Sequence, residues 1–169
     1  LPDVFVDSVR RFPDRVAIDV PPGPDRPRRM QVTYRELAHE VARIRARIRP
    51  WVEAECTVGI LLPRDSHVLV AAQLAVLSVG GAYVGSDVGF PDDHVNYVFR
   101  DAGVVAVLTD ADGRDRVRVD VPEERVVDVA SIAIVRSLEP SDLSPPEWVD
   151  AATMAYVIYT SGTTGRPKG

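Results

Sequence analysis

The sequence predicts an α/β domain with a largely parallel sheet and flanking helices. Short runs of β-branched residues alternate, along the first two thirds of the chain, with segments whose apolar residues recur at helical spacing. The segment 68–79 is apolar almost all round, as expected of a buried helix. Strands joined through helices pair in parallel, and 169 residues are enough to bury a core.

The first fifty residues predict two helices and two strands. Near-helical spacing of apolar residues predicts a helix that ends before Pro13, and polar–apolar alternation predicts the strand after it. Thr33 and Glu36 form a capping box, in which each side chain satisfies a free backbone N–H at a helix start. The expected segments are a helix at 2–12, strands at 15–20 and 30–33, and a helix at 33–50.

The rest of the chain continues the alternation. Asp65 or Ser66 is expected to cap a helix, Gly80-Gly81 supplies its left-handed end, and Pro91 fits the start of another helix. Valine-rich runs predict strands, and prolines among polar residues predict a late loop. The expected segments are a strand at 57–62, helices ending near 79 and 102, strands at 82–84, 104–109, 117–121 and 126–129, a loop at 138–148 and a strand at 153–159.

Composition and charge exclude several classes of protein. A content of 46% hydrophobic and 27% charged residues is typical of a globular protein and not of a disordered one. The net charge of −5 has the wrong sign for coating nucleic acid, and the apolar run is shorter than the ~20 residues that span a bilayer. We therefore expect neither nucleic acid nor membrane as a partner. Arginines spaced by two scatter around the helix at 33–50, where we expect solvated side chains: Arg43, Arg45, Arg47 and Arg49.

Cysteine usage and the chain ends add two expectations. Cys56 is the single cysteine and cannot form an internal disulfide, which fits a reducing compartment. No basic region followed by an apolar stretch opens the chain, so we expect a cytoplasmic protein. Because the chain starts at Leu1 and stops at Gly169 within a glycine-rich loop, we expect a fragment of a longer protein.

The stretch 159–169 carries the chemistry. Four hydroxyl side chains, three glycines and one lysine occupy the ten positions 160–169, directly after an expected strand. Glycines let successive N–H groups converge on an anion, and Lys168 adds a point charge suited to a polyphosphate. The pattern is not a Walker A loop, because Pro167 precedes the lysine and no Ser or Thr follows it. It nevertheless indicates phosphate handling.

This stretch closely resembles the signature loop of the adenylate-forming superfamily. That superfamily comprises the amino-acid adenylation domains of nonribosomal peptide synthetases, acyl-CoA synthetases, aryl acid ligases and luciferases. Residues 161–169 match its pattern throughout. The resemblance covers essentially the whole chain, since the segments 13–17, 33–37 and 58–62 are similar to early blocks of the family in the same order.

Within the superfamily, the chain is most similar to the peptide synthetase branch. The segments 80–84 and 155–159 resemble the peptide synthetase versions of these blocks, which favours amino-acid adenylation over the acyl-CoA branch. Gly85-Ser86 and His94 depart from the pattern, since a proline with an aliphatic residue and an arginine are common there. These departures leave the subfamily open.

The resemblance implies a fold, a reaction and a set of partners. Residues 1–169 would be the amino-terminal part of an AMP-binding or adenylation domain, within the large subdomain of the enzyme. An amino acid or other carboxylic acid would attack the α-phosphorus of ATP, giving an acyl adenylate and pyrophosphate, with ATP and Mg as cofactors. The phosphopantetheine thiol of a carrier protein would then take the acyl group, and a small helper protein is a further partner. The residues implied for the ATP phosphates are Thr160, Ser161, Gly162, Thr163, Thr164, Gly165 and Lys168.

Other parts of the family's active site lie beyond this motif. The carboxylate pocket, the magnesium acid, the ribose aspartate and the late lysine all follow it, so no catalytic residue and no metal ligand is assigned to this chain. We therefore expect the fragment alone to be inactive. Two alternatives stay open: an acyl-CoA or aryl acid ligase, and a non-catalytic adenylation-like module that docks a carrier or helper. The intact loop favours an enzyme.

Overall fold

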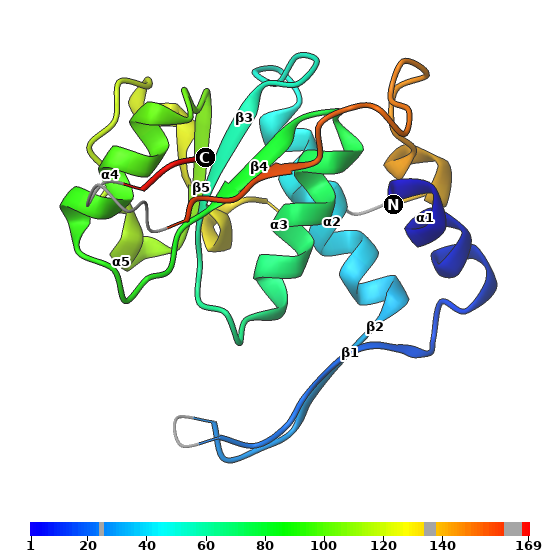
Figure 1. Ribbon diagram of the computed structural model, residues 1–169. Helices are drawn as coiled ribbons and strands as arrows, with labels where there is room; N and C mark the ends of the chain where they lie inside the picture. Colours follow the sequence, from blue (N-terminus) through cyan, green and yellow to red (C-terminus); the bar gives the residue numbers. More distant parts are fainter. Residues whose placement is uncertain (24–25, 134–137, 161–166) are drawn as a thin grey trace.

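The computed structural model describes residues 1–23, 26–133, 138–160 and 167–169, and Figure 1 shows how they are arranged. Among these residues five strands form one sheet, in which every neighbouring pair is parallel. The predicted α/β class with a largely parallel sheet is confirmed. In spatial order the strands are β6 (Val126–Asp128), β5 (Ala106–Thr109), β3 (Thr57–Leu61), β4 (Ala82–Gly85) and β7 (Tyr156–Val157).

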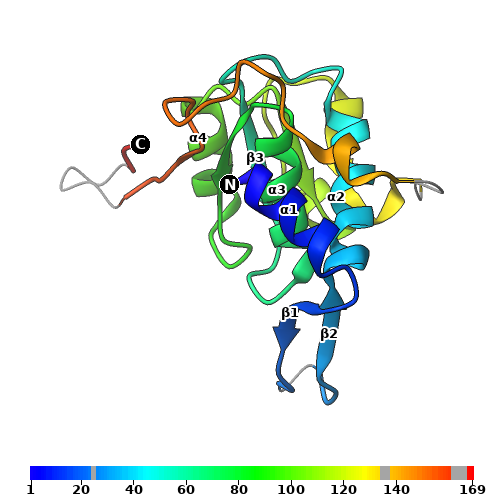
Figure 2. The same ribbon diagram turned by 90° about the vertical axis from the view of Figure 1, so that its right-hand side faces the viewer.

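Helices cover both faces of this sheet, as Figures 1 and 2 show from two directions. One face is covered by α2 (Tyr34–Ile48) and α3 (His67–Ser78), against whose outer side α1 (Pro2–Arg11) packs, and the other by α4 (Asp92–Asp101) and the short α5 (Ala111–Arg114). The expected capping box is present at the start of α2. None of the described helices combines the length and the apolar character that crossing a membrane requires.

The central strand β3 shows how the two faces are built. Val58 and Ile60 point into the core beneath α1, α2 and α3, whereas Leu61 packs into a second core with α4. This alternation follows from the two-residue period of a strand. Gly59 lies under the ring of Phe99, where an added Cβ would come within 3.2 Å of ring carbons. The glycine therefore lets α4 pack close to the sheet.

The two early strands do not belong to the parallel sheet. β1 (Val16–Val20) and β2 (Met30–Thr33) pair with each other in an antiparallel hairpin that projects from the body. Arg29 Nε lies 2.7 Å from Asp19 Oδ1 across this hairpin. The hairpin is thus an appendage, and the sheet proper begins with β3.

The prediction of a strand at 117–121 is wrong. This segment runs along α4 without pairing to another strand, although Val117 is buried in the core beneath α4. The side-chain amide of Asn96 bonds to it instead, donating to the Arg116 carbonyl (2.9 Å) and accepting from the Arg118 N–H (2.5 Å). A side chain thus satisfies the backbone groups that a neighbouring strand would otherwise satisfy.

The prediction that the arginines of α2 are solvated is also wrong for Arg43 and Arg45. The Arg43 side chain is only 10% exposed, pairs with Glu40 and donates to the carbonyl of Val129. Arg45 is half-buried and donates to the carbonyl of Ser144 (3.1 Å). The chain returns over this side of α2 after β6, and the guanidinium groups hold it there.

Candidate phosphate-binding site

The carboxyl edge of the sheet forms a crevice between β3 and β4. The chain leaves β3 toward α3 on one face and leaves β4 toward α4 on the other, and ligands of parallel sheets bind where such connections diverge. A hollow of about 580 Å³ lies at this edge. Its lining includes Arg64 from the end of β3, Asp87 from the end of β4 and Tyr159 from the end of β7.

Polar groups stand in this hollow beside apolar walls. Arg64 Nε lies 2.5 Å from Asp87 Oδ2, and the arginine side chain is largely exposed. Ser86 Oγ is shielded from solvent and has no hydrogen-bond partner among the described residues. A Cβ at Gly85 would meet nothing within 4 Å. Gly85 and Ser86, two of the three positions that depart from the peptide synthetase pattern, therefore both line this hollow, whereas His94 does not.

Strand β7 leads directly into the glycine-rich loop. Only Tyr156 and Val157 pair with β4, so the strand is shorter than the 153–159 expected. Beyond it, the Thr160 N–H donates to the Lys168 carbonyl (3.0 Å) and the Lys168 N–H donates to the Thr160 carbonyl (3.1 Å). This antiparallel pair closes the base of the loop and places Lys168 beside the carboxyl end of β7.

Two tyrosines connect the base of the loop to α4. The Tyr159 hydroxyl lies 2.6 Å from Asp101 Oδ2, and the Tyr97 hydroxyl donates to the Pro167 carbonyl at 3.3 Å. Burial and the hydrogen bond with Asp101 raise the pKa of Tyr159 well above its usual range, so its hydroxyl stays protonated. The tyrosine is then the donor and the carboxylate the acceptor.

The lysine at the base of the loop is exposed. Within the described part of the chain, no carboxylate forms an ion pair with its ammonium. A free ammonium at the carboxyl edge of a parallel sheet can bind an anionic ligand. The described residues contain no cluster of three His, Cys, Asp or Glu side chains that could hold a metal ion.

Of the residues predicted to bind phosphate, the structure describes Thr160 and Lys168 and brings them together. Ser161, Gly162, Thr163, Thr164 and Gly165 lie outside the described residues. No pattern in the sequence singles out Tyr97 and Asp101, which lie one helical turn apart on α4 and contact the base of the loop. Their spacing of four places them on one helix face, but only the fold shows that this face meets the loop.

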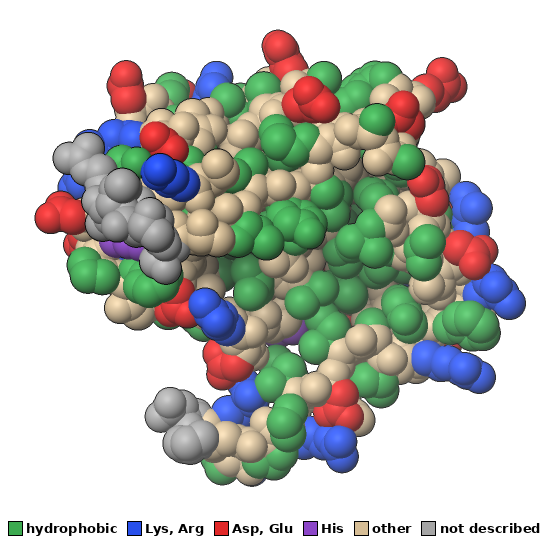
Figure 3. Space-filling model, in the orientation of Figure 1, with side chains coloured by type: hydrophobic (Ala, Val, Ile, Leu, Met, Phe, Trp, Pro, Cys, Tyr) green, Lys and Arg blue, Asp and Glu red, His purple; other side chains and the backbone are tan. Residues whose placement is uncertain are grey.

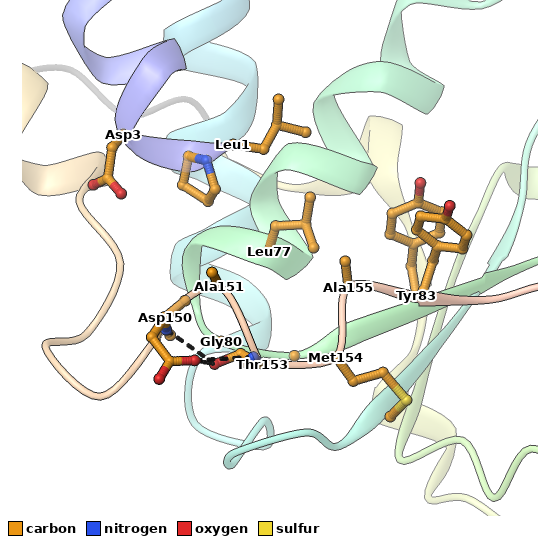
Figure 4. A pocket seen from close by; sticks show the side chains of 14 residues that line it. Leu1, Asp3, Leu77, Gly80, Tyr83, Asp150, Ala151, Thr153, Met154 and Ala155 are labelled. Atoms are coloured by element: carbon orange, nitrogen blue, oxygen red, sulfur yellow. Dashed lines mark hydrogen bonds between the residues drawn. The ribbon is translucent and has the colours of Figure 1, made fainter.

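A second cavity, of about 380 Å³, lies on the α3 side of β7. Figure 4 shows it between Leu1, Leu77 and the turn at Asp150, whose carboxylate accepts from the N–H groups of Ala152 (2.8 Å) and Thr153 (3.1 Å). Figure 3 shows hydrophobic side chains gathered on this face, which carries α3 and β7. The exposed apolar residues of those two elements and their neighbours are Val70, Met154, Tyr156 and Ile158.

Residues 5–169 match the family described as AMP-binding enzyme, and the chain belongs to this family. It is similar to two curated synthetases. The AMB antimetabolite synthetase AmbB of Pseudomonas aeruginosa is 39% identical over 98% of this chain, and tyrocidine synthase 1 of Brevibacillus parabrevis is 34% identical over 98%. The chain spans only 12% of AmbB and 14% of tyrocidine synthase 1.

Solved structures show the same fold. The N-terminal subdomain of Klebsiella oxytoca NpsA superposes with a TM-score of 0.75 at 27% identity, over 99% of this chain and 41% of that subdomain. The nonribosomal peptide synthetase FmoA3 superposes with a TM-score of 0.76 at 27% identity, over 95% of this chain and 16% of that one. The resemblance to the adenylate-forming superfamily is therefore confirmed, with peptide synthetases among the similar proteins.

Proposed function

We propose that this chain is the amino-terminal, ATP-phosphate-binding part of an adenylation domain that activates an amino acid. The observation that carries the proposal is the paired base of the loop, where Thr160 and Lys168 meet at the carboxyl end of β7. This position lies beside the crevice at which parallel sheets bind ligands. Membership of the AMP-binding family and similarity to peptide synthetases support it.

The proposed adenylation reaction requires the chain to hold the phosphate groups of ATP in position. The substrate carboxylate attacks the α-phosphorus of ATP, an acyl adenylate forms and pyrophosphate leaves. Donors on the β- and γ-phosphates lower the barrier by stabilising the charge of the leaving group. In our proposal the Lys168 ammonium supplies one positive charge, and the hydroxyl and N–H groups of the loop supply donors from Thr160, Ser161, Gly162, Thr163, Thr164 and Gly165.

Partners and cofactors follow from the same proposal. NpsA has been solved in complex with 3-hydroxybenzoyl-AMSN and as an artificial adenylation–PCP fusion, and AB3403 has been solved with AMP and glycine. These structures support an adenylate intermediate and a carrier protein for the parent of this chain. Magnesium would offset the phosphate charge, held by residues outside this chain. We place the reaction in the cytoplasm, where Cys56 would stay reduced.

The test is ATP–pyrophosphate exchange by the intact parent protein, offered pooled amino acids and then pooled aryl and fatty acids. Exchange with amino acids supports the proposal, and exchange with another pool assigns the parent to the aryl acid or acyl-CoA branch. If folded parent protein, supplied with candidate helper proteins, shows no exchange with any pool, a non-catalytic docking module is favoured.

A charge-matched pair of variants assigns the phosphate contact. Lys168→Ala should slow exchange on the order of 100-fold, because a charged partner of the leaving group is lost. Arg10→Ala removes an equal charge from the exposed side of α1 and should leave the rate unchanged. Equal rates in both variants would remove Lys168 from the mechanism.

A further inference from the structure

Helix α4 reaches the phosphate loop through two side chains on one of its faces. Tyr97 and Asp101 are four residues apart, so they lie one above the other on the helix. Tyr97 Oη bonds to the Pro167 carbonyl at 3.3 Å, and Asp101 Oδ2 bonds to the Tyr159 hydroxyl at 2.6 Å. In the sequence, Pro167 follows the loop and Tyr159 precedes it, so α4 contacts both ends of the loop.

The ring of Tyr159 also touches the returning end of the loop. A Cβ built on Gly169 would lie 2.8 Å from two carbons of this ring, closer than any side chain can come. The backbone at Gly169 therefore packs directly on the tyrosine. Lys168 is thus flanked by Pro167, which Tyr97 holds, and by Gly169, which lies on Tyr159, while its own backbone pairs with Thr160.

The position of α4 does not depend on the loop. Val95, Val98 and Phe99 of this helix are buried against the sheet, and Asn96 bonds to the segment beside it. The helix is therefore a rigid support whose location the core determines. The hydrogen bonds of the Tyr97 and Tyr159 hydroxyl groups link the base of the loop to this helix.

We propose that Tyr97 and the Tyr159–Asp101 pair are positioning residues that hold the backbone of Lys168 in place for the ATP phosphates. A lysine side chain is long and flexible, so its charge is placed well only if its Cα is held. Groups held in place before the reaction need no reorganisation as charge develops on the leaving phosphates. This inference rests on the proposed function, because it names the support of the same phosphate contact.

The experiment compares hydroxyl deletions in the intact parent protein. Tyr97→Phe and Tyr159→Phe should each raise the KM for ATP or lower kcat about three- to tenfold, the effect of one lost hydrogen bond. The KM for the carboxylic acid should stay unchanged. Tyr34→Phe removes a tyrosine hydroxyl at the start of α2 and serves as the control, with both constants unchanged. Unchanged constants in all three variants would overturn the proposal.

A double-mutant cycle separates positioning from a general structural role. If Tyr97 acts through Lys168, Tyr97→Phe should have almost no further effect in a Lys168→Ala background. An equal loss in both backgrounds would show that the hydroxyl supports the fold in general and would contradict the proposal. Gly169→Ala provides a second test, because its Cβ would push the backbone off the Tyr159 ring and should act like Tyr97→Phe.

Calorimetric titration of ATP into the parent protein distinguishes the two proposals. A wild-type protein that binds ATP but shows no exchange would contradict the proposed function alone. In that case weaker ATP binding by Tyr97→Phe than by Tyr34→Phe would still support positioning, and equal binding would overturn it. A folded wild-type protein that neither exchanges nor binds ATP would contradict both proposals.

Discussion

The central strand β3 and the edge strand β7 run parallel in one sheet, yet different forces hold them. All five residues of β3 are buried, and it pairs with strands on both sides. In β7 and just beyond it, Tyr156 is 52% and Ile158 is 64% exposed, and among the described strands only β4 pairs with it. Apolar burial thus stabilises the centre, whereas a few polar contacts hold the strand that carries the loop. Stability and site geometry should therefore be separable by mutation.

The sharpest test of this difference compares two isoleucines. Ile60→Ala, in β3, should cost about 2–5 kcal/mol of unfolding free energy, because it leaves a cavity in the core beneath α2 and α3. Ile158→Ala, beyond β7, should change the free energy by less than about 0.5 kcal/mol, because its side chain is exposed. Urea unfolding measures both values. Similar losses in the two variants would show that β7 is as well packed as β3.

A smaller effect is expected from the buried hydroxyl at the end of the central strands. Thr109 Oγ1 of β5 donates to the Leu61 carbonyl of β3 at 3.0 Å, and Thr109 is fully buried. Thr109→Val keeps the shape of the side chain and removes this bond, so it should cost about 1 kcal/mol. The same unfolding measurement applies. An unchanged free energy of unfolding would mean that this hydrogen bond adds no net stability to the centre of the sheet.

At the edge, the stability contributed by Tyr159 should depend on pH. Burial and the bond with Asp101 raise the pKa of Tyr159 above its ordinary value of 10.0, so the native state holds this proton more tightly than the unfolded chain does. Its contribution is fully present below the unfolded pKa and is lost as the pH rises through the folded pKa. Tyr159→Phe should therefore flatten the decline in unfolding midpoint above about pH 10.

The smallest effect is expected in the turn that leads into β7. Hydrogen bonds from the N–H groups of Ala152 and Thr153 lower the pKa of Asp150 below its ordinary value of 3.8. Its contribution to stability is therefore present above the unfolded pKa and is lost as the pH falls through the folded pKa. Asp150→Asn should slightly lower the unfolding midpoint at neutral pH, and the difference from wild type should shrink below about pH 4. A difference that stays constant with pH would exclude a role for the charge.

Local patterns predicted most of the elements that position the site. The Thr33–Glu36 capping box marks the start of α2, and Ser66 caps α3, because both contacts lie within a few residues. The valine-rich segment at 117–121 shows the limit of this reasoning. Its β propensity is high, but Asn96 and the core beneath α4 determine its conformation.

The candidate site also contains one part that the sequence predicts and one part that only the fold shows. The glycine-rich stretch with Lys168 indicates a phosphate loop from residue types and spacing alone, because backbone flexibility and charge are local properties. Tyr97 and Asp101 carry no such pattern. They join the site only because the packing of α4 brings them to Pro167 and Tyr159, which are 70 and 58 residues away in the chain.

By itself, the sequence determined the α/β class and the start of each long helix, and it predicted a phosphate loop, since these depend on periodicity, capping and short-range chemistry. Only the tertiary structure decided that β1 and β2 leave the sheet, that Arg43 and Arg45 hold a returning segment, and that Tyr97 of α4 bonds to the Pro167 carbonyl. These features join residues far apart in the chain. Their geometry follows from how the two faces of the sheet are packed, which no local pattern records.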